Sequence, residues 1–192
     1  MSQTFEARLN QILPRLTSPE LLNNCGHGGE IGFWIFDYPP EREMEMRAFL
    51  QEVIIPALAK RQPPVKVEAV NLFDLVIGQL EERKLLDKVI DMQQTKGDAA
   101  VLASLRSVLK EDKLAQKLAT QIDLPSLDLL ILWGVGTVYP MLRTHTLLSA
   151  LHPIMQDTPL LMLYPGRYDG HSLRLFNKLA EDHYYRAFQL VP

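Results

Sequence analysis

The sequence predicts an α/β fold: a single domain over residues 1–192 with a mainly parallel sheet of about five strands and helices on both faces. Short apolar runs of strand length recur along the chain, and stretches with apolar residues every three or four positions separate them. This alternation favours parallel pairing, because parallel strands need a crossover between them. A hydrophobic fraction of 47% and a charged fraction of 22% are typical of one globular core.

The first predicted element is a helix over 2–17, because its apolar residues recur at the spacing of one helix face. These residues are Phe5, Leu9, Ile12, Leu13 and Leu16. A turn-rich stretch with Gly26, Gly28 and Gly29 then leads into the apolar run 31–36. That run predicts a buried first strand.

A second helix is predicted from Glu41, and Pro56 is expected to kink or end it because proline has no amide donor. Residues 65–72 predict the second strand. From 73 to 121 the pattern is helical only, with a division near Gly97. We therefore expect a helical insertion of two helices between strands 2 and 3.

The runs 127–135 and 160–164 predict the third and fourth strands, because nearly unbroken apolar runs are typical of strands covered on both faces. Helices are expected over 139–151 and 171–183. Residues 186–191 then predict a fifth strand that ends the sheet.

Charge and cysteine content narrow the class of protein. The formal net charge is -3 and the basic residues are spread out, so nucleic-acid contact by this chain on its own is not expected. A local basic patch near the C-terminus is an alternative that the sequence leaves open, at Arg167, Arg174, Lys178 and Arg186. Cys25 is the only cysteine, which is typical of a reducing compartment. With no signal-peptide pattern and no apolar run of about 20 residues, we expect a cytoplasmic protein without a membrane segment.

Loops after the strands are the candidate ligand sites, because open parallel sheets bind ligands beyond the carboxyl ends of their strands. The first such loop begins at Asp37, and its prolines and acids disfavour a phosphate cradle. The loop after the third strand contains Gly134, Gly136 and Thr137. It predicts either a sharp turn or an amide-lined anion site, and the second would make the chain a degenerate nucleotide-binding domain.

The stretch 164–172 after the fourth strand is the densest polar segment. One interpretation is a bend at Pro165 and Gly166, with Asp169 capping the next helix. The other is a partner-binding edge, since arginine and tyrosine supply much of the contact energy where proteins meet. Its candidate residues are Arg167, Tyr168, Asp169, His171 and Arg174.

We find no complete catalytic or metal-binding set. Asp169, His171 and Ser172 are the residue types of a hydrolytic triad, but neighbours in one turn rarely reach the required geometry. Asp37 and Asp169 could hold a magnesium ion between them, although a single acid after a strand more often serves a turn or a cap. The five histidines are scattered and make no zinc motif. We predict no enzyme activity, cofactor or bound metal.

Four stretches resemble the BrxB family of BREX phage-defence systems. They are LLMLYPGRYDGHSLRLF, IGFWIFDYPP, DLLILWGVGTVYP and RAFQLVP. The resemblance implies a role beside other BREX components, chiefly PglZ, an alkaline-phosphatase-like protein, and it supplies no catalytic residues. The expected function is a protein–protein interaction adaptor that binds PglZ. A degenerate nucleotide-binding domain, a DNA-contacting subunit of the same complex and a homodimer stay open as alternatives.

Overall fold

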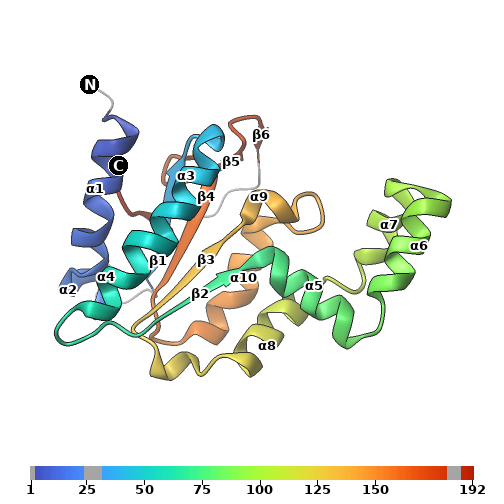
Figure 1. Ribbon diagram of the computed structural model, residues 1–192, viewed down its shortest axis with the longest axis horizontal. Coiled ribbons are helices and arrows are strands. Elements are labelled where there is room, and N and C mark those ends of the chain that lie inside the picture. Colours follow the sequence, from blue (N-terminus) through green and yellow to red (C-terminus); the bar gives the residue numbers. More distant parts are fainter. Residues whose placement is uncertain (1–2, 24–31, 181–186) are drawn as a thin grey trace.

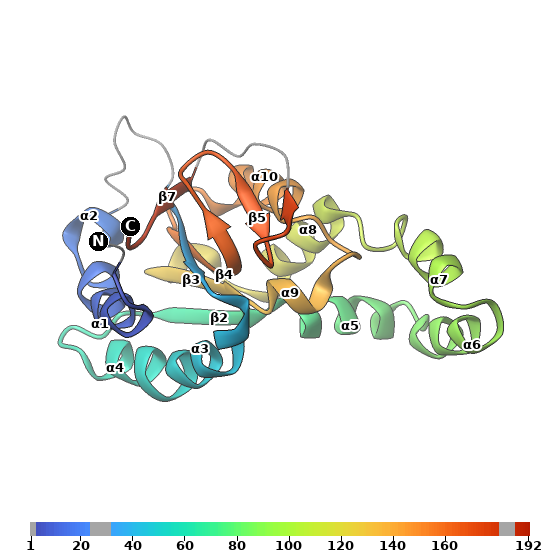
Figure 2. The same ribbon diagram turned by 90° about the horizontal axis from the view of Figure 1, so that it is seen from above.

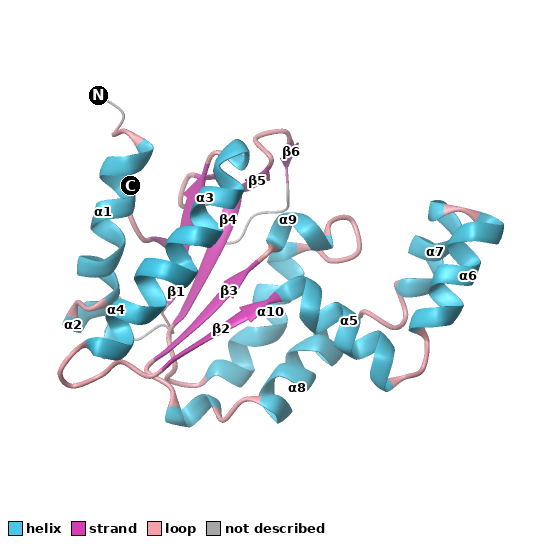
Figure 3. Cartoon of the chain, viewed as in Figure 1, coloured by secondary structure: helices cyan, strands magenta, loops and turns pink. Residues whose placement is uncertain are grey.

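Helices cover both faces of one sheet in the computed structural model of this chain (Figures 1 and 3). The structure describes residues 3–23, 32–180 and 187–192. The predicted glycine-rich turn and the position of Cys25 therefore lie outside the described residues. No described helix has the length and apolar character needed to cross a bilayer.

The sheet is mixed, and the described residues contribute seven strands to it. Five of them run parallel in the order β2-β3-β4-β1-β7, and β5 and β6 extend β4 in antiparallel pairing. The α/β class is confirmed, whereas a mainly parallel sheet of about five strands is not, because the sheet is mixed. The strands are β1 (Phe33–Tyr38), β2 (Val67–Asn71), β3 (Leu129–Trp133), β4 (Leu160–Tyr168), β5 (Leu173–Leu175), β6 (Leu179–Ala180) and β7 (Ala187–Gln189).

Side chains of alternate residues in the central strands pack into two separate hydrophobic cores. In β1, Phe33 and Ile35 face one core, and Trp34 and Phe36 face the other. In β3 and β4 the same alternation holds, so these strands are apolar on both faces. Burial of one such large apolar side chain stabilises the fold by roughly 1.5–3 kcal/mol, which explains why the apolar runs identified the strands.

One face of the sheet is covered by the helices that flank β1 in the sequence (Figure 2). These are α1 (Phe5–Leu16), α2 (Pro19–Leu22), the 3-10 turn Pro40–Arg42, α3 (Glu43–Phe49), the π-helical turn Leu50–Ile54 and α4 (Ile55–Lys60). Thr4 caps α1 by accepting a hydrogen bond from the amide of Ala7. The wide π-helical turn directly precedes Pro56, where the sequence predicted a kink or an end.

The other face is covered by helices from the β2–β3 and β3–β4 connections. They are α5 (Leu72–Glu82), α8 (Glu111–Gln121), the 3-10 turn Leu124–Ser126, α9 (Val135–Val138) and α10 (Thr144–Met155). The single helix predicted over 139–151 is wrong in its start, because Tyr139 is extended and ends α9. A Pro140 that follows Tyr139 favours this extended backbone.

The insertion after β2 contains four helices, so the prediction of two is wrong. Between α5 and α8 lie α6 (Leu86–Lys96) and α7 (Asp98–Leu105), divided at Gly97 as expected. The missed break is at Lys84, which adopts a φ of 54° between α5 and α6. Figures 1 and 2 both show α6 and α7 projecting from the body, away from the sheet.

Beyond β4 the chain folds back as a hairpin. The helix predicted over 171–183 is wrong for its described part, because residues 173–175 and 179–180 form β5 and β6. Leu173 and Leu175 are buried and Arg174 between them is exposed, which is the two-residue period of a strand. The fifth predicted strand, over 186–191, corresponds to β7.

Candidate functional site

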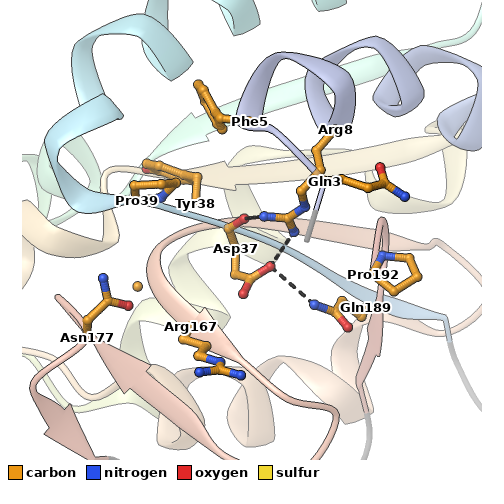
Figure 4. Close-up of a pocket in the computed structure, with 11 residues that line it drawn as sticks. Gln3, Phe5, Arg8, Asp37, Tyr38, Pro39, Arg167, Asn177, Gln189 and Pro192 are labelled. Atoms are coloured by element: carbon orange, nitrogen blue, oxygen red, sulfur yellow. Dashed lines mark hydrogen bonds and ion pairs between the residues drawn. The ribbon is translucent and has the colours of Figure 1, made fainter. Parts of the chain in front are cut away.

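A cavity of about 570 Å³ opens where β1 and β4 end, at the carboxyl edge of the sheet (Figure 4). The start of α1, the end of β1, the β4–β5 hairpin and β7 form its walls. The lining side chains that matter below are Phe5, Arg8, Asp37, Arg167, Asn177 and Gln189. A volume of this size falls in the range of small-molecule sites.

An ion pair between Arg8 and Asp37 closes one wall of this cavity. Arg8 Nη2 lies 2.5 Å from Asp37 Oδ1, and Arg8 Nη1 donates to the Asp37 carbonyl at 2.8 Å. Arg8 Nη2 also donates to the carbonyl of Val191 at 2.8 Å, and the guanidinium lies 4.9 Å from the centre of the Phe36 ring. One side chain of α1 thus joins β1 to the segment that follows β7.

Asp37 has further donors besides Arg8. The backbone amide of Tyr168 donates to Asp37 Oδ2 at 3.0 Å, and Gln189 Nε2 lies 3.4 Å from Asp37 Oδ1. Only 6% of Asp37 is exposed. Because both carboxylate oxygens already accept hydrogen bonds, Asp37 serves here as a buried structural acid rather than an open metal ligand. Within residues 3–23, 32–180 and 187–192, no three histidine, cysteine or acidic side chains group as metal ligands.

Two buried tyrosines near the strand ends stay protonated at neutral pH. Burial, reinforced by Glu43, raises the pKa of Tyr38 far above its ordinary value, and Tyr38 donates to Glu43 Oε2 at 2.5 Å. Burial, with a smaller effect of Asp169, raises the pKa of Tyr168 to about 12. Neither phenol is tuned for proton transfer near pH 7.

Residues 164–172 are not the loop that the sequence predicted. Pro165 and Gly166 continue β4, where Pro165 pairs in register with Tyr38 of β1 and Gly166 with Leu175 of β5. A Cβ atom on Gly166 would collide with the backbone carbonyl of Arg174. Glycine is therefore required at this position by the close approach of the two hairpin strands, not by a bend.

The five predicted partner-binding residues separate into buried and exposed sets. Tyr168 is 1% exposed and its hydroxyl donates to the Ala187 carbonyl, so its side chain is buried within this chain. Arg167, Asp169, His171 and Arg174 are exposed on the hairpin. Their role in binding a partner stays a prediction.

Asp169 organises the turn of the hairpin instead of capping a helix. Its carboxylate accepts hydrogen bonds from the amides of His171 and Ser172 and from the Ser172 hydroxyl. Gly170 follows with a φ of 91°, which only glycine adopts without strain. Because the Ser172 hydroxyl donates to the acid, these three residues do not have the order of a hydrolytic triad, in which histidine lies between the other two.

This turn gives a testable pH dependence. The Ser172 amide and hydroxyl, then the His171 amide, lower the pKa of Asp169 from 3.8 to about 2. A carboxyl with a lowered folded-state pKa stabilises the fold above its ordinary pKa, and this contribution disappears as pH falls toward the folded value. We expect an Asp169→Ala variant to unfold more easily than the wild type at neutral pH. Denaturant unfolding should show this difference shrinking between pH 3.8 and about 2; a constant difference would contradict it.

Arg167 and Arg174 lie directly opposite each other in the β4–β5 ladder. Opposite residues of an antiparallel pair share one face, with Cβ atoms about 5 Å apart, and like charges placed there are destabilising. Neither guanidinium has a hydrogen bond or ion pair to a carboxylate of the described residues. In Figure 4 Arg167 reaches into the cavity, and no dashed line joins it to another residue drawn.

Gly134, Gly136 and Thr137 form a packed turn away from this cavity. Gly134 has a φ of 77°, and a Cβ there would approach Asn71 Oδ1 to 2.6 Å. The Thr137 hydroxyl donates to the Gly134 carbonyl at 2.6 Å, and the Phe176 ring packs on Gly136. These contacts show a tightly packed sharp turn, and an anion site on its amides stays a prediction.

Sequence reasoning missed Arg8 and Gln189, because neither belongs to a local motif. Their partners lie 29 and 152 residues away. A local signal did exist for the hairpin. The Asp169–Gly170 pair followed by Leu173 and Leu175 at alternate positions is typical of two strands joined by a tight turn.

Comparison with known proteins identifies similar sequences. The model of the family described as "BREX protein BrxB" matches residues 68–190. A "BREX protein BrxB" of Escherichia coli O9:H4 (strain HS) is 39% identical over 188 residues, which cover 98% of this chain and 92% of that protein. A "BREX protein BrxB" of Bacillus cereus (strain H3081.97) is also 39% identical over 188 residues, covering 96% of each chain. No solved structure gives a significant match.

Proposed function

Because this chain belongs to the BrxB family, whose members are proteins of BREX phage-defence systems, we propose that it is a non-catalytic adaptor that binds PglZ. Membership of the family makes other BREX components the natural partners. The observation that carries the proposal is the pair of helices α6 and α7, which projects from the body (Figure 1) and leaves the apolar side chain of Ile90 exposed.

The projecting pair has little support of its own. No residue of α6 is buried, although Leu86 and Val89 are partly covered. Ile90 is 48% exposed. An isolated helix of 11 residues is marginal in water, so its stability depends on what it packs against. A partner that covers this surface would stabilise α6 and bury Ile90, as an adaptor requires.

Polar chemistry at the strand ends also favours a binding role over catalysis. Asp37 and Arg8 neutralise each other, and Tyr38 keeps its proton at neutral pH. A general base must present a free basic atom to a substrate. Arg8 and Asp37 are engaged with each other and Tyr38 is protonated, so these three side chains do not supply one.

The adaptor proposal predicts that Ile90→Glu weakens the complex with PglZ at least about tenfold, because a buried apolar contact would be replaced by an unpaired charge. Met44→Glu is the matched control, since Met44 is 73% exposed on α3, at the other end of the molecule. Calorimetric titration of purified PglZ from the same BREX gene cluster would measure both affinities.

Two outcomes would contradict the proposal. Equal affinity of the two variants would reject α6 as the contact surface. Absence of any complex between the folded wild-type proteins would reject the adaptor role itself. A homodimer that competes with PglZ would appear as a dissociation step in the same titration.

A further inference from the structure

We propose that the cavity at the carboxyl ends of β1 and β4 binds a small organic phosphate of nucleotide size, with its phosphate group held by Arg167 and Arg174. This binding function goes beyond the adaptor role and is independent of it, because α6 and Ile90 lie at the far end of the molecule (Figure 1).

Charged side chains lie on the walls of the cavity. Among its lining residues they are Arg8, Asp37 and Arg167. Arg8 and Asp37 form a closed pair, so Arg167 is the charged lining side chain that no described side chain pairs with. Asp169, in the adjoining turn, directs its carboxylate to its own turn amides. Arg167 is therefore the group in this cavity that would attract an anion.

The two arginines lie side by side on adjacent strands. Arg174 does not itself line the cavity, but it is the direct cross-strand neighbour of Arg167, which does. One guanidinium is enough to engage a carboxylate in two parallel hydrogen bonds, whereas a phosphate has oxygens for two guanidinium groups. An anion between them would also relieve the repulsion of like charges on adjacent strands. The pair therefore favours phosphate over carboxylate.

The size and lining of the cavity suit a phosphate that carries an organic group. A volume of about 570 Å³ leaves room for an organic group beside the phosphate. Phe5 and Pro39 provide apolar surface, and the amides of Asn177 and Gln189 provide polar groups at the same cavity (Figure 4).

The turn that joins β5 to β6 positions the side chain of Asn177 at the cavity. Phe176 and Asn177 adopt φ angles of 54° and 61° at the turn that joins β5 to β6, and this left-handed region is costly for the bulky Phe176 but readily adopted by asparagine. The Phe176 amide donates to the Pro165 carbonyl at 2.9 Å, and its ring lies edge-on to Tyr139 with centres 6.3 Å apart. These contacts hold the turn that presents Asn177 to the cavity, and strained turns often cluster at functional sites.

The test is calorimetric titration of the full chain with adenosine 5′-monophosphate, ribose 5-phosphate, adenosine and inorganic phosphate. We expect adenosine 5′-monophosphate, ribose 5-phosphate or both to bind. Binding of only one of them shows whether the site takes a nucleotide or a sugar phosphate. Adenosine should not bind, and inorganic phosphate should bind more weakly. Arg167→Gln and Arg174→Gln should each lower the affinity at least about tenfold, because each removes a charge-assisted hydrogen bond. Higher salt should weaken binding.

Arg106→Gln is the matched control, because Arg106 is an exposed arginine at the end of α7 and should leave the affinity unchanged. Absence of binding of both organic phosphates at millimolar concentration would overturn the proposal. So would wild-type affinity in Arg167→Gln, equal binding of adenosine, or inorganic phosphate binding as tightly. Binding of duplex DNA that needs both arginines, without binding of either small phosphate, would replace it with a nucleic-acid surface.

Discussion

Replacing Arg8 with methionine is expected to lower the free energy of unfolding by about 3 kcal/mol, because it leaves the buried carboxylate of Asp37 without its charged partner. The side chains of this pair are 15% and 9% exposed, so water cannot readily replace the guanidinium. The Tyr168 amide and Gln189 still donate to Asp37, which keeps the loss at the lower end of the range for buried pairs. Denaturant unfolding of both proteins measures the difference.

Arg42→Met is the matched control for Arg8→Met. Arg42 also pairs with acids, Glu6 and Glu45, and lies over the ring of Phe5, but its side chain is 45% exposed. Surface pairs of this kind contribute little to stability, because water screens them. A loss in Arg8→Met as small as that in Arg42→Met would show that the Arg8–Asp37 pair does not hold α1 on the sheet.

The Arg8–Asp37 pair also explains why the sequence misplaced the first strand. Its predicted end was residue 36, because an acid at 37 normally stops a buried apolar run. The structure continues β1 to Tyr38, since a guanidinium from α1 neutralises that acid. The residues within the strand cannot show that Asp37 is neutralised, because its partner Arg8 lies 29 residues upstream.

The central strands could be predicted because their signal is local. Residues 129–133 and 160–164 are apolar on both faces, and only a strand buried between two helical layers needs that pattern. The helical insertion was recognised for the same reason, through its spacing of apolar residues. Its break at Lys84 was missed because lysine carries none of the turn signals of glycine or proline.

The hairpin after β4 was missed because two periods compete in one short stretch. Leu173, Phe176 and Leu179 have helical spacing, whereas Leu173 and Leu175 have strand spacing. Backbone pairing with β4 decides between them. The same pairing brings Arg167 to the cavity that Asp37 lines, so two candidates that the sequence treated separately belong to one site.

The second large effect is expected for Gly166→Ala, which should lower the free energy of unfolding by about 3 kcal/mol, the upper end of the usual cost of overpacking. A Cβ at this position meets the backbone carbonyl of Arg174, and a backbone atom in a ladder cannot move aside as a side chain can. Separation of β4 from β5 would also part Arg167 from Arg174. The variant should therefore lose both stability and the binding of organic phosphate.

Gly170→Ala separates this steric effect from backbone strain in the same hairpin. Gly170 has a φ of 91° but nothing within 4 Å of an added Cβ, so only conformational strain opposes the change. A strained backbone residue of this kind costs on the order of 1 kcal/mol. Thermal unfolding of the two variants should rank Gly166→Ala as the less stable, with phosphate binding retained in Gly170→Ala. The reverse ranking would mean that β4 and β5 do not approach as closely as their register requires, and Arg174 would then not lie beside Arg167.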